Sequence, residues 1–325
     1  MRILFLSDKW APYPGGAESY VTNVASALFM CGHQIGVLTS YPRALQPGWN
    51  QNFDITVEQI LTQWEDISAA ERSLWVKIKL NEFKPDIVFV NRFFAEDKCG
   101  FAPALKDYKV AEIVHNFISF PGAKFRLFNS KYTMNRQENC LNIAPSMVIL
   151  PPSYVQHDIP LIDNRIGMVK PHQGKGVGTF YQIADMSPRE RFAILRGEVH
   201  PAVEDIRDKL NITFIPPVEN MSEFYEMCRI VLVPSLMEDA GTIPQDCARA
   251  GRPCISSAVM GLRETNAGGV LIENAQNVEV WMDAIRRFSE RKGYYEEVVA
   301  RQRAYIDSIN WPAKFDELDA RLRNL

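Results

Sequence analysis

The sequence predicts an α/β protein made of two doubly wound, parallel-sheet domains in tandem, and three observations support this prediction. Short β-branched and apolar runs alternate with helical stretches along nearly the whole chain, which is typical of parallel βαβ units. The pair Pro151-Pro152, followed by a polar stretch, interrupts this alternation near the middle. The length of 325 residues exceeds what one ordinary core supports. We therefore expect domains at residues 1–153 and 154–310.

The first domain opens with a strand, a helix and a glycine that ends the helix. The helix is expected from Ala17 to Phe29, because Cys31-Gly32 follows it as a C-terminal glycine stop. The run Asp86–Val90 is apolar after its first residue, as in a strand covered on both faces. The other expected strands are Arg2–Ser7, Ile35–Thr39, Val110–His115, Phe125–Asn129 and Met147–Leu150.

The second domain repeats the alternation and ends in an amphipathic, helical C-terminus. Its expected strands are Ile166–Val169, Phe192–Leu195, Ile212–Ile215, Ile230–Val233, Pro253–Ser257 and Gly269–Ile272. Its expected helices cover Val177–Asp185, Ala202–Leu210, Ser222–Cys228 and residues 243–250. Ligands bind doubly wound sheets beyond the carboxyl ends of the strands, so the loops at those ends are the candidate sites.

Composition excludes several classes of protein. A net charge of -3 argues against a nucleic-acid binder, and no run approaches the roughly 20 apolar residues that span a bilayer. The first apolar run, Ile3 to Leu6, is too short for a signal peptide. We expect a cytoplasmic protein without a structural metal or a cofactor, and peripheral membrane contact stays open. The scattered cysteines, expected to be reduced core residues, are Cys31, Cys99, Cys140, Cys228, Cys247 and Cys254.

In each domain, one glycine-containing loop follows the first strand. Gly15 and Gly16 lead into a helix start, where the backbone can approach a phosphate or a sugar oxygen. The loop lacks the GxGxxG spacing, which disfavours dinucleotide binding by the usual route. In the second domain, Lys175 lies between Gly174 and Gly176 just before a helix, in position to neutralise an anion. A tight turn and a solvated lysine are the structural alternatives.

The segment from Val233 to Gly251 is the most informative. Thr242 and Gln245 have capping-box spacing, so a helix is expected to start at Thr242. Glu238 ahead of it and Asp246 within it could accept hydrogen bonds from sugar or ribose hydroxyls. The N–H groups of Gly241, Thr242 and Ile243 could meet an anion. A solvated Glu238, and an Asp246 that only offsets the helix dipole, are the alternatives.

At this point the sequence resembles the retaining nucleotide-sugar glycosyltransferases of the GT-B fold, particularly family four. The resemblance covers nearly the whole chain, and the motifs fall in the family's order. The matching segments are Arg2-Ile-Leu-Phe-Leu-Ser with Gly15-Gly16-Ala17-Glu18, Cys31-Gly32-His33-Gln34-Ile35, Lys84-Pro85-Asp86-Ile87-Val88, His115-Asn116, Lys175-Gly176, Pro234-Ser235 through Gly251, Arg252-Pro253, Gly261-Leu262-Arg263-Glu264 and Trp311-Pro312.

The resemblance implies two Rossmann-like domains with an interdomain cleft, and a C-terminal helix at 311–325 that crosses back onto the first domain. It implies metal-independent hexosyl or deoxyhexosyl transfer, with retention, from a UDP-, GDP- or dTDP-sugar to a glycan, lipid or small molecule. Lys175 would hold the diphosphate, with Lys170 nearby and the amides of Gly241, Thr242 and Ile243 assisting. Glu238 and His115 would contact the transferred sugar, and Asp246 the ribose. Gly15 and Gly16 would approach the diphosphate or the acceptor.

The sequence departs from the family at three positions. Asp246 stands where the family has Glu, Ala240 where it has an aromatic residue, and Lys170 is the nearest substitute for an arginine. These departures motivate a second hypothesis, a catalytically silent nucleotide-sugar-binding subunit that supports a partner. An epimerase or phosphorylase with the same architecture is a third hypothesis, and it fits less well.

The acceptor site is the least specified part of the sequence. Aromatic and polar residues in the first-domain loops could stack on a sugar or bind it, although each is more commonly a core or scattered surface residue. The candidates are Trp10, Tyr13, Arg92, Phe93, Phe94, Asn116 and Phe117.

Overall fold

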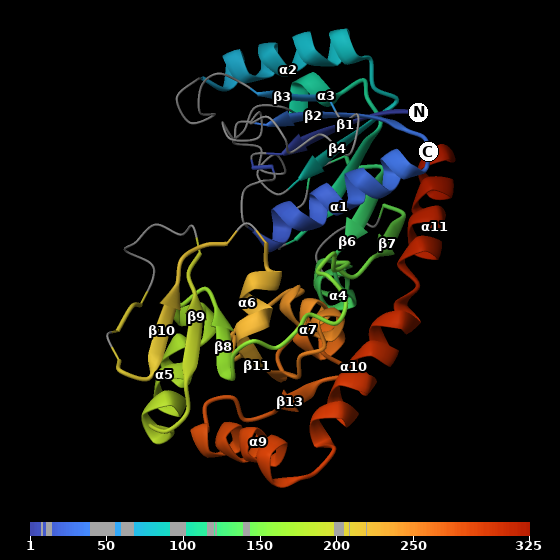
Figure 1. Cartoon of the computed structure of the whole chain (residues 1–325). Helices are drawn as coiled ribbons and strands as arrows, with labels where there is room; N and C mark the ends of the chain where they lie inside the picture. The colour runs from blue at the N-terminus through green and yellow to red at the C-terminus, as the bar shows by residue number, and fades with distance from the viewer. Residues whose placement is uncertain are drawn as a thin grey trace. The chain divides into compact units, whose positions relative to one another are not determined.

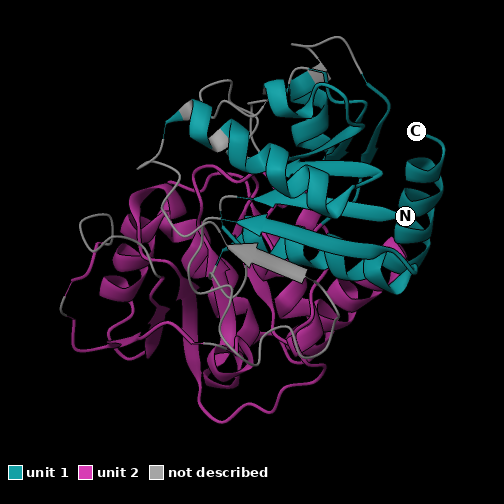
Figure 2. Cartoon of the chain, turned by 90° about the horizontal axis from the view of Figure 1, so that it is seen from above, with its two compact units in different colours: residues 1–150, 311–325 teal, residues 151–310 magenta. Residues whose placement is uncertain are grey.

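The protein is described by a computed structural model (Figure 1). It describes residues 1–7, 9–10, 15–39, 56–59, 68–91, 102–115, 120, 122–138, 144–197, 205–207, 209–218 and 220–325. The chain divides into two compact units, Met1–Leu150 with Trp311–Leu325 and Pro151–Asn310, and Figure 2 colours them separately. The first unit thus ends at Leu150, just before the proline pair that the sequence marks as a linker.

Unit 1 is built on a parallel, doubly wound sheet of seven strands in the order β3-β2-β1-β4-β5-β6-β7. The chain starts in the middle of the sheet and moves outward in both directions, so the order reverses between β1 and β4. The strands are β1 (Arg2–Ser7), β2 (Gln34–Thr39), β3 (Thr56–Gln59), β4 (Ile87–Asn91), β5 (Val110–Val114), β6 (Phe125–Phe128) and β7 (Ser146–Val148).

The helices of unit 1 are α1 (Gly16–Met30), α2 (Ala69–Phe83), α3 (Ala102–Leu105), α4 (Lys131–Glu138) and α11 (Trp311–Arg323). Helices α1 and α11 share one core cluster with one face of the sheet, and α2 and α3 share a second cluster with the other face. The last helix therefore returns to unit 1 (Figure 2). Polar contacts hold it there: Trp311 Nε1 donates to the Leu150 carbonyl at 2.8 Å, Arg321 Nη1 donates to the Ser146 carbonyl at 3.2 Å, and His33 Nε2 lies 2.6 Å from Asp319 Oδ1.

Unit 2 carries a six-stranded parallel sheet in the order β10-β9-β8-β11-β12-β13, which reverses between β8 and β11. Its strands are β8 (Arg165–Val169), β9 (Phe192–Leu195), β10 (Ile212–Ile215), β11 (Cys228–Val233), β12 (Cys254–Ser257) and β13 (Val270–Ile272). Its helices are η4 (Gln173–Lys175, a 3-10 turn), α5 (Val177–Met186), α6 (Ser222–Met227), α7 (Ile243–Ala250), α8 (Leu262–Thr265), α9 (Val278–Glu290) and α10 (Tyr294–Ile309).

The expected helix at Ala202–Leu210 is wrong where the structure describes it. Residues 205–207 and 209 are not helical. The backbone of Asp205 forms hydrogen bonds outside any helix: its N–H donates to the Pro171 carbonyl at 2.8 Å, and its carbonyl accepts from the Tyr181 hydroxyl at 2.6 Å. The Arg207 guanidinium lies 4.9 Å from the Tyr181 ring centroid. Tertiary contacts with Tyr181 therefore override the local helix pattern.

None of the described helices is long and apolar enough to cross a lipid bilayer. Four cysteines are free thiols: Cys228, Cys247 and Cys254 are buried, as the sequence predicts, whereas Cys31 is only half-buried. Cys99 and Cys140 lie outside the described residues.

Candidate functional site

The carboxyl edge of the unit 2 sheet gathers the predicted anion-binding residues. Strand β8 ends at Val169, and the loop passes through Lys170 and η4 to Gly176, where α5 begins. Gly176 has φ of 76°, and a Cβ at this position would lie 1.9 Å from the carbonyl oxygen of Pro234. Only glycine fits such a left-handed, close approach. This contact presses the lysine loop against the loop that follows β11.

A backbone hydrogen bond and an ion pair join the same two loops. The N–H of Leu236 donates to the carbonyl of Gly174 at 3.0 Å. Lys175 Nζ donates to Glu238 Oε2, and Ser235 Oγ donates to the same oxygen at 3.3 Å. The two charged side chains are 29% and 16% exposed, so the pair is partly desolvated and still reachable from solvent. The sequence predicts both residues at the site but not their mutual pairing.

The start of α7 lies beside Glu238. A Cβ on Gly241 would be 3.4 Å from Glu238 Cγ, so the carboxylate side chain packs against the residue that leads into the helix. The first N–H groups of an α-helix have no intrahelical partner, and they carry the positive end of the helix dipole. Lys175, Glu238 and the α7 start therefore form one cluster, which combines a cation, a carboxylate and unsatisfied amides.

The predicted capping box at this helix is wrong. Thr242 has helical backbone angles, φ of −83° and ψ of −27°, and its side chain makes no capping hydrogen bond. A capping side chain instead needs an extended N-cap residue to reach back to the helix. Gln245 is fully buried. In the amide orientation that gives both its oxygen and its nitrogen suitable partners, the nitrogen donates to the carbonyls of Gly241 at 2.8 Å and Thr242 at 3.2 Å. Gln245 thus fixes the turn that enters α7.

Asp246 is held by two residues that the sequence did not single out. The Tyr225 hydroxyl donates to Asp246 Oδ2 at 3.3 Å, and Ser153 also hydrogen-bonds the carboxylate. Burial raises the pKa of Asp246 to about 6, and the two hydrogen bonds oppose this rise. The residue itself is half-buried. Tyr225 and Ser153 come from α6 and from the segment after β7, so spacing along the sequence could not have linked them to Asp246.

His172 adds a titratable group to the lysine loop. Burial lowers the pKa of His172, and the charges of Lys175 and Lys170 lower it further, against the opposing effect of Glu238. The imidazole is therefore neutral near pH 7. Lys170, with φ of 59°, begins this loop in a left-handed conformation that is unusual for lysine.

The glycine loop of unit 1 has a different character. Gly15 is extended and caps α1 without a side-chain hydrogen bond. The Oε2 atom of Glu18 lies only 1.8 Å from where a Cβ on Gly15 would be, and the Glu18 residue is 7% exposed. A buried carboxylate thus covers the start of α1 and repels other anions there. This contact argues against the expectation that Gly15 and Gly16 approach the donor diphosphate.

The remaining predicted residues of unit 1 have mixed outcomes. Trp10 is 1% exposed and packs in the core with its ring centroid 6.0 Å from that of Phe5. We therefore correct its predicted acceptor role, because a buried indole offers no face for stacking on a sugar. His115 is buried at the end of β5, edge-on to Tyr20 with ring centroids 5.4 Å apart. Outside the described residues lie Tyr13, Arg92, Phe93, Phe94, Asn116 and Phe117.

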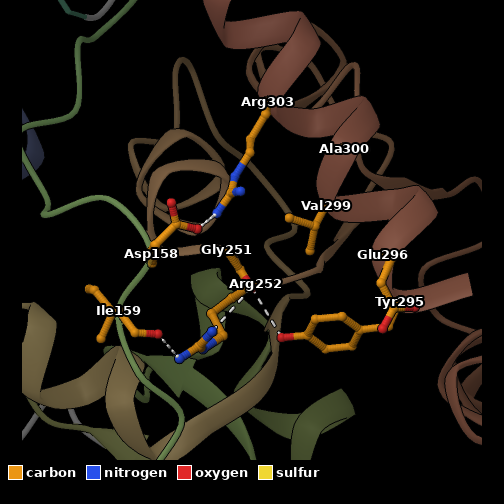
Figure 3. A pocket seen from close by; sticks show the side chains of 10 residues that line it. Asp158, Ile159, Gly251, Arg252, Tyr295, Glu296, Val299, Ala300 and Arg303 are labelled. Carbon is orange, nitrogen blue, oxygen red and sulfur yellow. Dashed lines mark hydrogen bonds and ion pairs between the residues drawn. The ribbon is translucent and has the colours of Figure 1, made fainter. Parts of the chain in front are cut away.

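A separate cavity of about 440 Å³ lies at the other end of α7 (Figure 3). Figure 3 shows Arg303 and Asp158 pointing toward each other as an ion pair, and Arg252 reaching the Ile159 carbonyl. Arg252 also donates to the carbonyl of Gly251, which accepts from the Tyr295 hydroxyl at 3.1 Å as well. These groups satisfy the carbonyls at the helix end and complement its negative dipole. The cavity walls therefore brace the C-terminus of α7.

No metal cluster is found in the part of the chain that the structure describes: no group of three or more His, Cys, Asp and Glu side chains there could hold an ion.

Comparison with known proteins bears on the same regions. Residues 166–291, which lie within unit 2, match the family model described as Glycosyl transferases group 1. The D-inositol 3-phosphate glycosyltransferase of Streptomyces griseus is 26% identical over 105 residues, which is 31% of this chain. The matched part spans 22% of that relative's length.

Two solved structures resemble the whole chain. Sucrose-phosphate synthase from Thermosynechococcus elongatus has a TM-score of 0.77 at 14% identity, and the match covers 99% of this chain and 98% of that one. Anabaena HepE in complex with UDP-glucose has a TM-score of 0.77 at 13% identity, with 100% of both chains covered. At such identities the likeness shows the fold. The prediction of a GT-B fold with two Rossmann-like domains is confirmed.

Proposed function

We propose, on the premise that residues 166–291 form a glycosyl transferases group 1 domain within a GT-B fold, that the chain transfers a sugar from a nucleotide-sugar donor to an acceptor. The observation that carries the proposal is the cluster of Lys175, Glu238 and the start of α7. It combines a cation and helix amides, which suit a diphosphate, with a carboxylate, which suits sugar hydroxyls.

The cluster can stabilise the charge that develops in such a reaction. When the anomeric bond breaks, the leaving nucleoside diphosphate gains negative charge. Lys175 and the first amides of α7 would stabilise this charge without movement of their loop backbones, because the Gly176–Pro234 contact and the Leu236–Gly174 hydrogen bond already fix these loops. The Lys175–Glu238 ion pair must open for the nucleotide-sugar to bind. Lys175 would then contact the diphosphate, and Glu238 would contact the sugar hydroxyls.

The other residues have subordinate roles in the proposal. Asp246, oriented by Tyr225 and Ser153, would accept a ribose hydroxyl. Its side chain is one methylene shorter than the Glu of the family, and the Tyr225 hydroxyl positions it. His115 would contact the transferred sugar. Retention of the anomeric configuration and independence of metal ions complete the proposal and follow from the family resemblance.

Activity with a donor panel tests the proposal. UDP-glucose is the first donor to use, because the HepE structure contains it, followed by GDP- and dTDP-sugars. We expect release of the nucleoside diphosphate on incubation with hydroxylated acceptors, unchanged by EDTA, and an NMR spectrum of the product that shows the donor's anomeric configuration. The Lys175→Ala variant should lose about 100-fold or more in kcat/KM.

A lysine in the same unit offers the matched control. Lys209 also forms an ion pair, with Asp185, but it lies outside the cluster. Lys209→Ala should leave kcat/KM within about twofold of wild type. Equal activity of wild type and Lys175→Ala would defeat the proposed function.

One observation favours a second candidate. Because Lys175 and Glu238 neutralise each other in the described structure, the cluster could hold a nucleotide without turning it over. A silent binding subunit would bind nucleoside diphosphate but release none from any donor. Multiple turnovers by the isolated chain would eliminate this candidate.

A further inference from the structure

The motif Gly261-Leu262-Arg263-Glu264 begins at a turn that lies directly against the loop carrying Glu238. This turn, residues 258–261, follows β12 and precedes α8, and we call it the β12 turn. The N–H of Gly261 donates to the Glu238 carbonyl at 3.0 Å. A Cβ on Gly261 would lie 1.7 Å from the Asp239 carbonyl oxygen, so only glycine lets the two backbones approach this closely.

Two buried serines anchor the same loop at a second point. Ser257, the last residue of β12, is fully buried, and its Oγ donates to the Ser235 carbonyl. Ser235 is also buried, and its own Oγ donates to Glu238 Oε2 at 3.3 Å. The end of β12 therefore reaches the backbone of Glu238 through Gly261 and its carboxylate through Ser235.

The backbone of the β12 turn is strained. Met260 has φ of 39°, in the left-handed region that residues other than glycine rarely adopt. Hydrogen bonds within the turn hold it: the N–H of Leu262 donates to the Val259 carbonyl at 2.9 Å, and the N–H of Arg263 donates to the Met260 carbonyl at 3.2 Å. Such strain persists only where surrounding contacts impose it, and it concentrates at functional sites. The β12 turn is thus held in one conformation against the Glu238 loop.

The Glu238 loop needs anchors because it has no regular structure of its own. Residues 234–242, between β11 and α7, form neither helix nor strand. In the proposed function Lys175 leaves Glu238 to contact the diphosphate, so their ion pair cannot hold the carboxylate while the donor is bound. The contacts of Glu238 with Ser235 and Gly261 do not involve Lys175, and they can stay in place.

We infer that Ser235 and Gly261 are positioning residues, which hold the Glu238 carboxylate in place for the transferred sugar once the ion pair with Lys175 has opened. The inference rests on the proposed function, because it takes Glu238 as the group that contacts the sugar. A carboxylate that is already oriented loses less freedom when it binds a hydroxyl. Ser235 and Gly261 therefore determine how much the sugar adds to the affinity for the donor, whereas the nucleoside diphosphate alone depends on Lys175 and the start of α7.

Paired titrations of a nucleotide-sugar and its nucleoside diphosphate test the inference without turnover. The pairs are UDP-glucose with UDP, GDP-mannose with GDP and dTDP-glucose with dTDP, titrated by calorimetry against the full chain without acceptor. The measured ratio is the Kd of the nucleoside diphosphate divided by the Kd of the nucleotide-sugar, for the pair that wild type binds most tightly. We expect Ser235→Ala to lower this ratio about fivefold to tenfold, and to change the Kd of the nucleoside diphosphate less than about threefold.

Gly261→Ala tests the backbone contact, because its methyl would displace the Asp239 carbonyl, and it should lower the ratio at least about fivefold. Gly178→Ala is its matched control, since the nearest atom to the added methyl would be 3.8 Å away. If Gly261→Ala does not fold, Ser235→Ala decides alone. Its control is Ser187→Ala, whose lost hydroxyl contacts the Met282 sulfur outside the cluster. A ratio within about twofold of wild type in Ser235→Ala, or equal weakening of both ligands, would overturn the inference.

The outcome is distinguishable from that of the proposed function. A ratio that depends on Ser235, in a chain that transfers sugar from no donor, would uphold the positioning role and reject the transferase. Lys175-dependent transfer with an unchanged ratio in Ser235→Ala would do the reverse. If wild type bound none of the nucleotide-sugars, both would be rejected.

Discussion

The two units have sheets of the same parallel, doubly wound kind, and yet the carboxyl edges of these sheets have opposite chemistry. In unit 2 the edge presents Lys175, Lys170 and the amide end of α7. In unit 1 the edge holds the buried carboxylate of Glu18 and the buried oxygens of Asn91 and Asn129, which have no hydrogen-bond partner among the described residues. The shared topology fixes where a ligand can bind, and the loop residues decide which charge it carries.

The difference originates in the first loop after the first strand of each unit. Both loops contain glycine and lead into a helix. In unit 1 the first helical turn contains Glu18, which already meets the positive end of the α1 dipole. In unit 2 the first turn of α5 has no acidic residue, and Lys175 stands immediately before Gly176. A single acidic or basic residue thus decides whether such a loop repels or attracts a phosphate.

The largest effect is expected from Gly176→Ala, which breaks the junction between the two loops of unit 2. The added methyl would meet the Pro234 carbonyl oxygen at 1.9 Å, at a φ that alanine rarely adopts. We expect a loss of about 2–4 kcal/mol in the free energy of unfolding, measured by urea denaturation. Gly178→Ala in α5 is the control, because its nearest neighbour would be 3.8 Å away. A Gly176→Ala protein as stable as wild type would show that the loops are not in contact.

Glu238→Gln sharpens the comparison by removing the only acid paired with Lys175 among the described ion pairs. With its charge no longer neutralised, Lys175 should hold UDP about threefold to tenfold more tightly in calorimetry. Transfer should nevertheless slow by at least about tenfold, because the sugar loses a carboxylate contact. Unchanged UDP affinity would mean that the ion pair does not compete with the diphosphate.

Asp246→Asn tests the environment of the first turn of α7 through pH. Burial raises the folded-state pKa of Asp246 from 3.8 to about 6, so between these values the folded protein keeps a proton that the unfolded chain has lost. The free energy of unfolding contributed by this group therefore falls as the pH rises from about 4 to 6. The asparagine variant lacks this fall. The difference in free energy of unfolding between the asparagine variant and wild type should therefore shift in favour of the variant by about 1–2 kcal/mol between about pH 4 and pH 7.5. This is less than the full pKa shift corresponds to, because the residue is half-buried.

A variant whose stability difference from wild type is the same at both pH values would contradict the raised pKa.

The smallest effect is expected from Glu18→Gln, which removes the acid from the unit 1 edge. The Glu18 carboxylate lies in the first turn of α1, where it offsets the positive end of the helix dipole. Its loss should lower the free energy of unfolding by about 0.3–1 kcal/mol in urea denaturation. An unchanged free energy of unfolding would show that Glu18 does not offset the dipole.

The fold was largely predictable because buried parallel strands have continuous apolar sequences. The strands of unit 2 start and end within two residues of their expected positions. Strand Ile212–Ile215 and strand Phe192–Leu195 are found as expected. Helix α2 was missed although Ser68 and Glu71 form a capping box, because its apolar periodicity is weak. The helix expected at Ala202–Leu210 failed because Tyr181 binds the backbone of Asp205.

Site residues were predictable only where the local sequence around each of them forms a motif. Lys175, Glu238 and the α7 start were expected, and the structure brings them together. The support of Asp246 by Tyr225 and Ser153 depends on three distant segments, which no local pattern reveals. Likewise, only the strand order brings Asn91, at the end of β4, and Asn129, just after β6, to the same edge of the sheet, with β5 between their strands.

The most direct test of the central claim is a calorimetric comparison of UDP with uridine, on wild type, Lys175→Ala and Lys209→Ala. If Lys175 and the α7 amides hold the diphosphate, Lys175→Ala weakens UDP at least about tenfold, leaves uridine unchanged, and Lys209→Ala matches wild type. UDP affinity that is the same in wild type and Lys175→Ala would contradict the account.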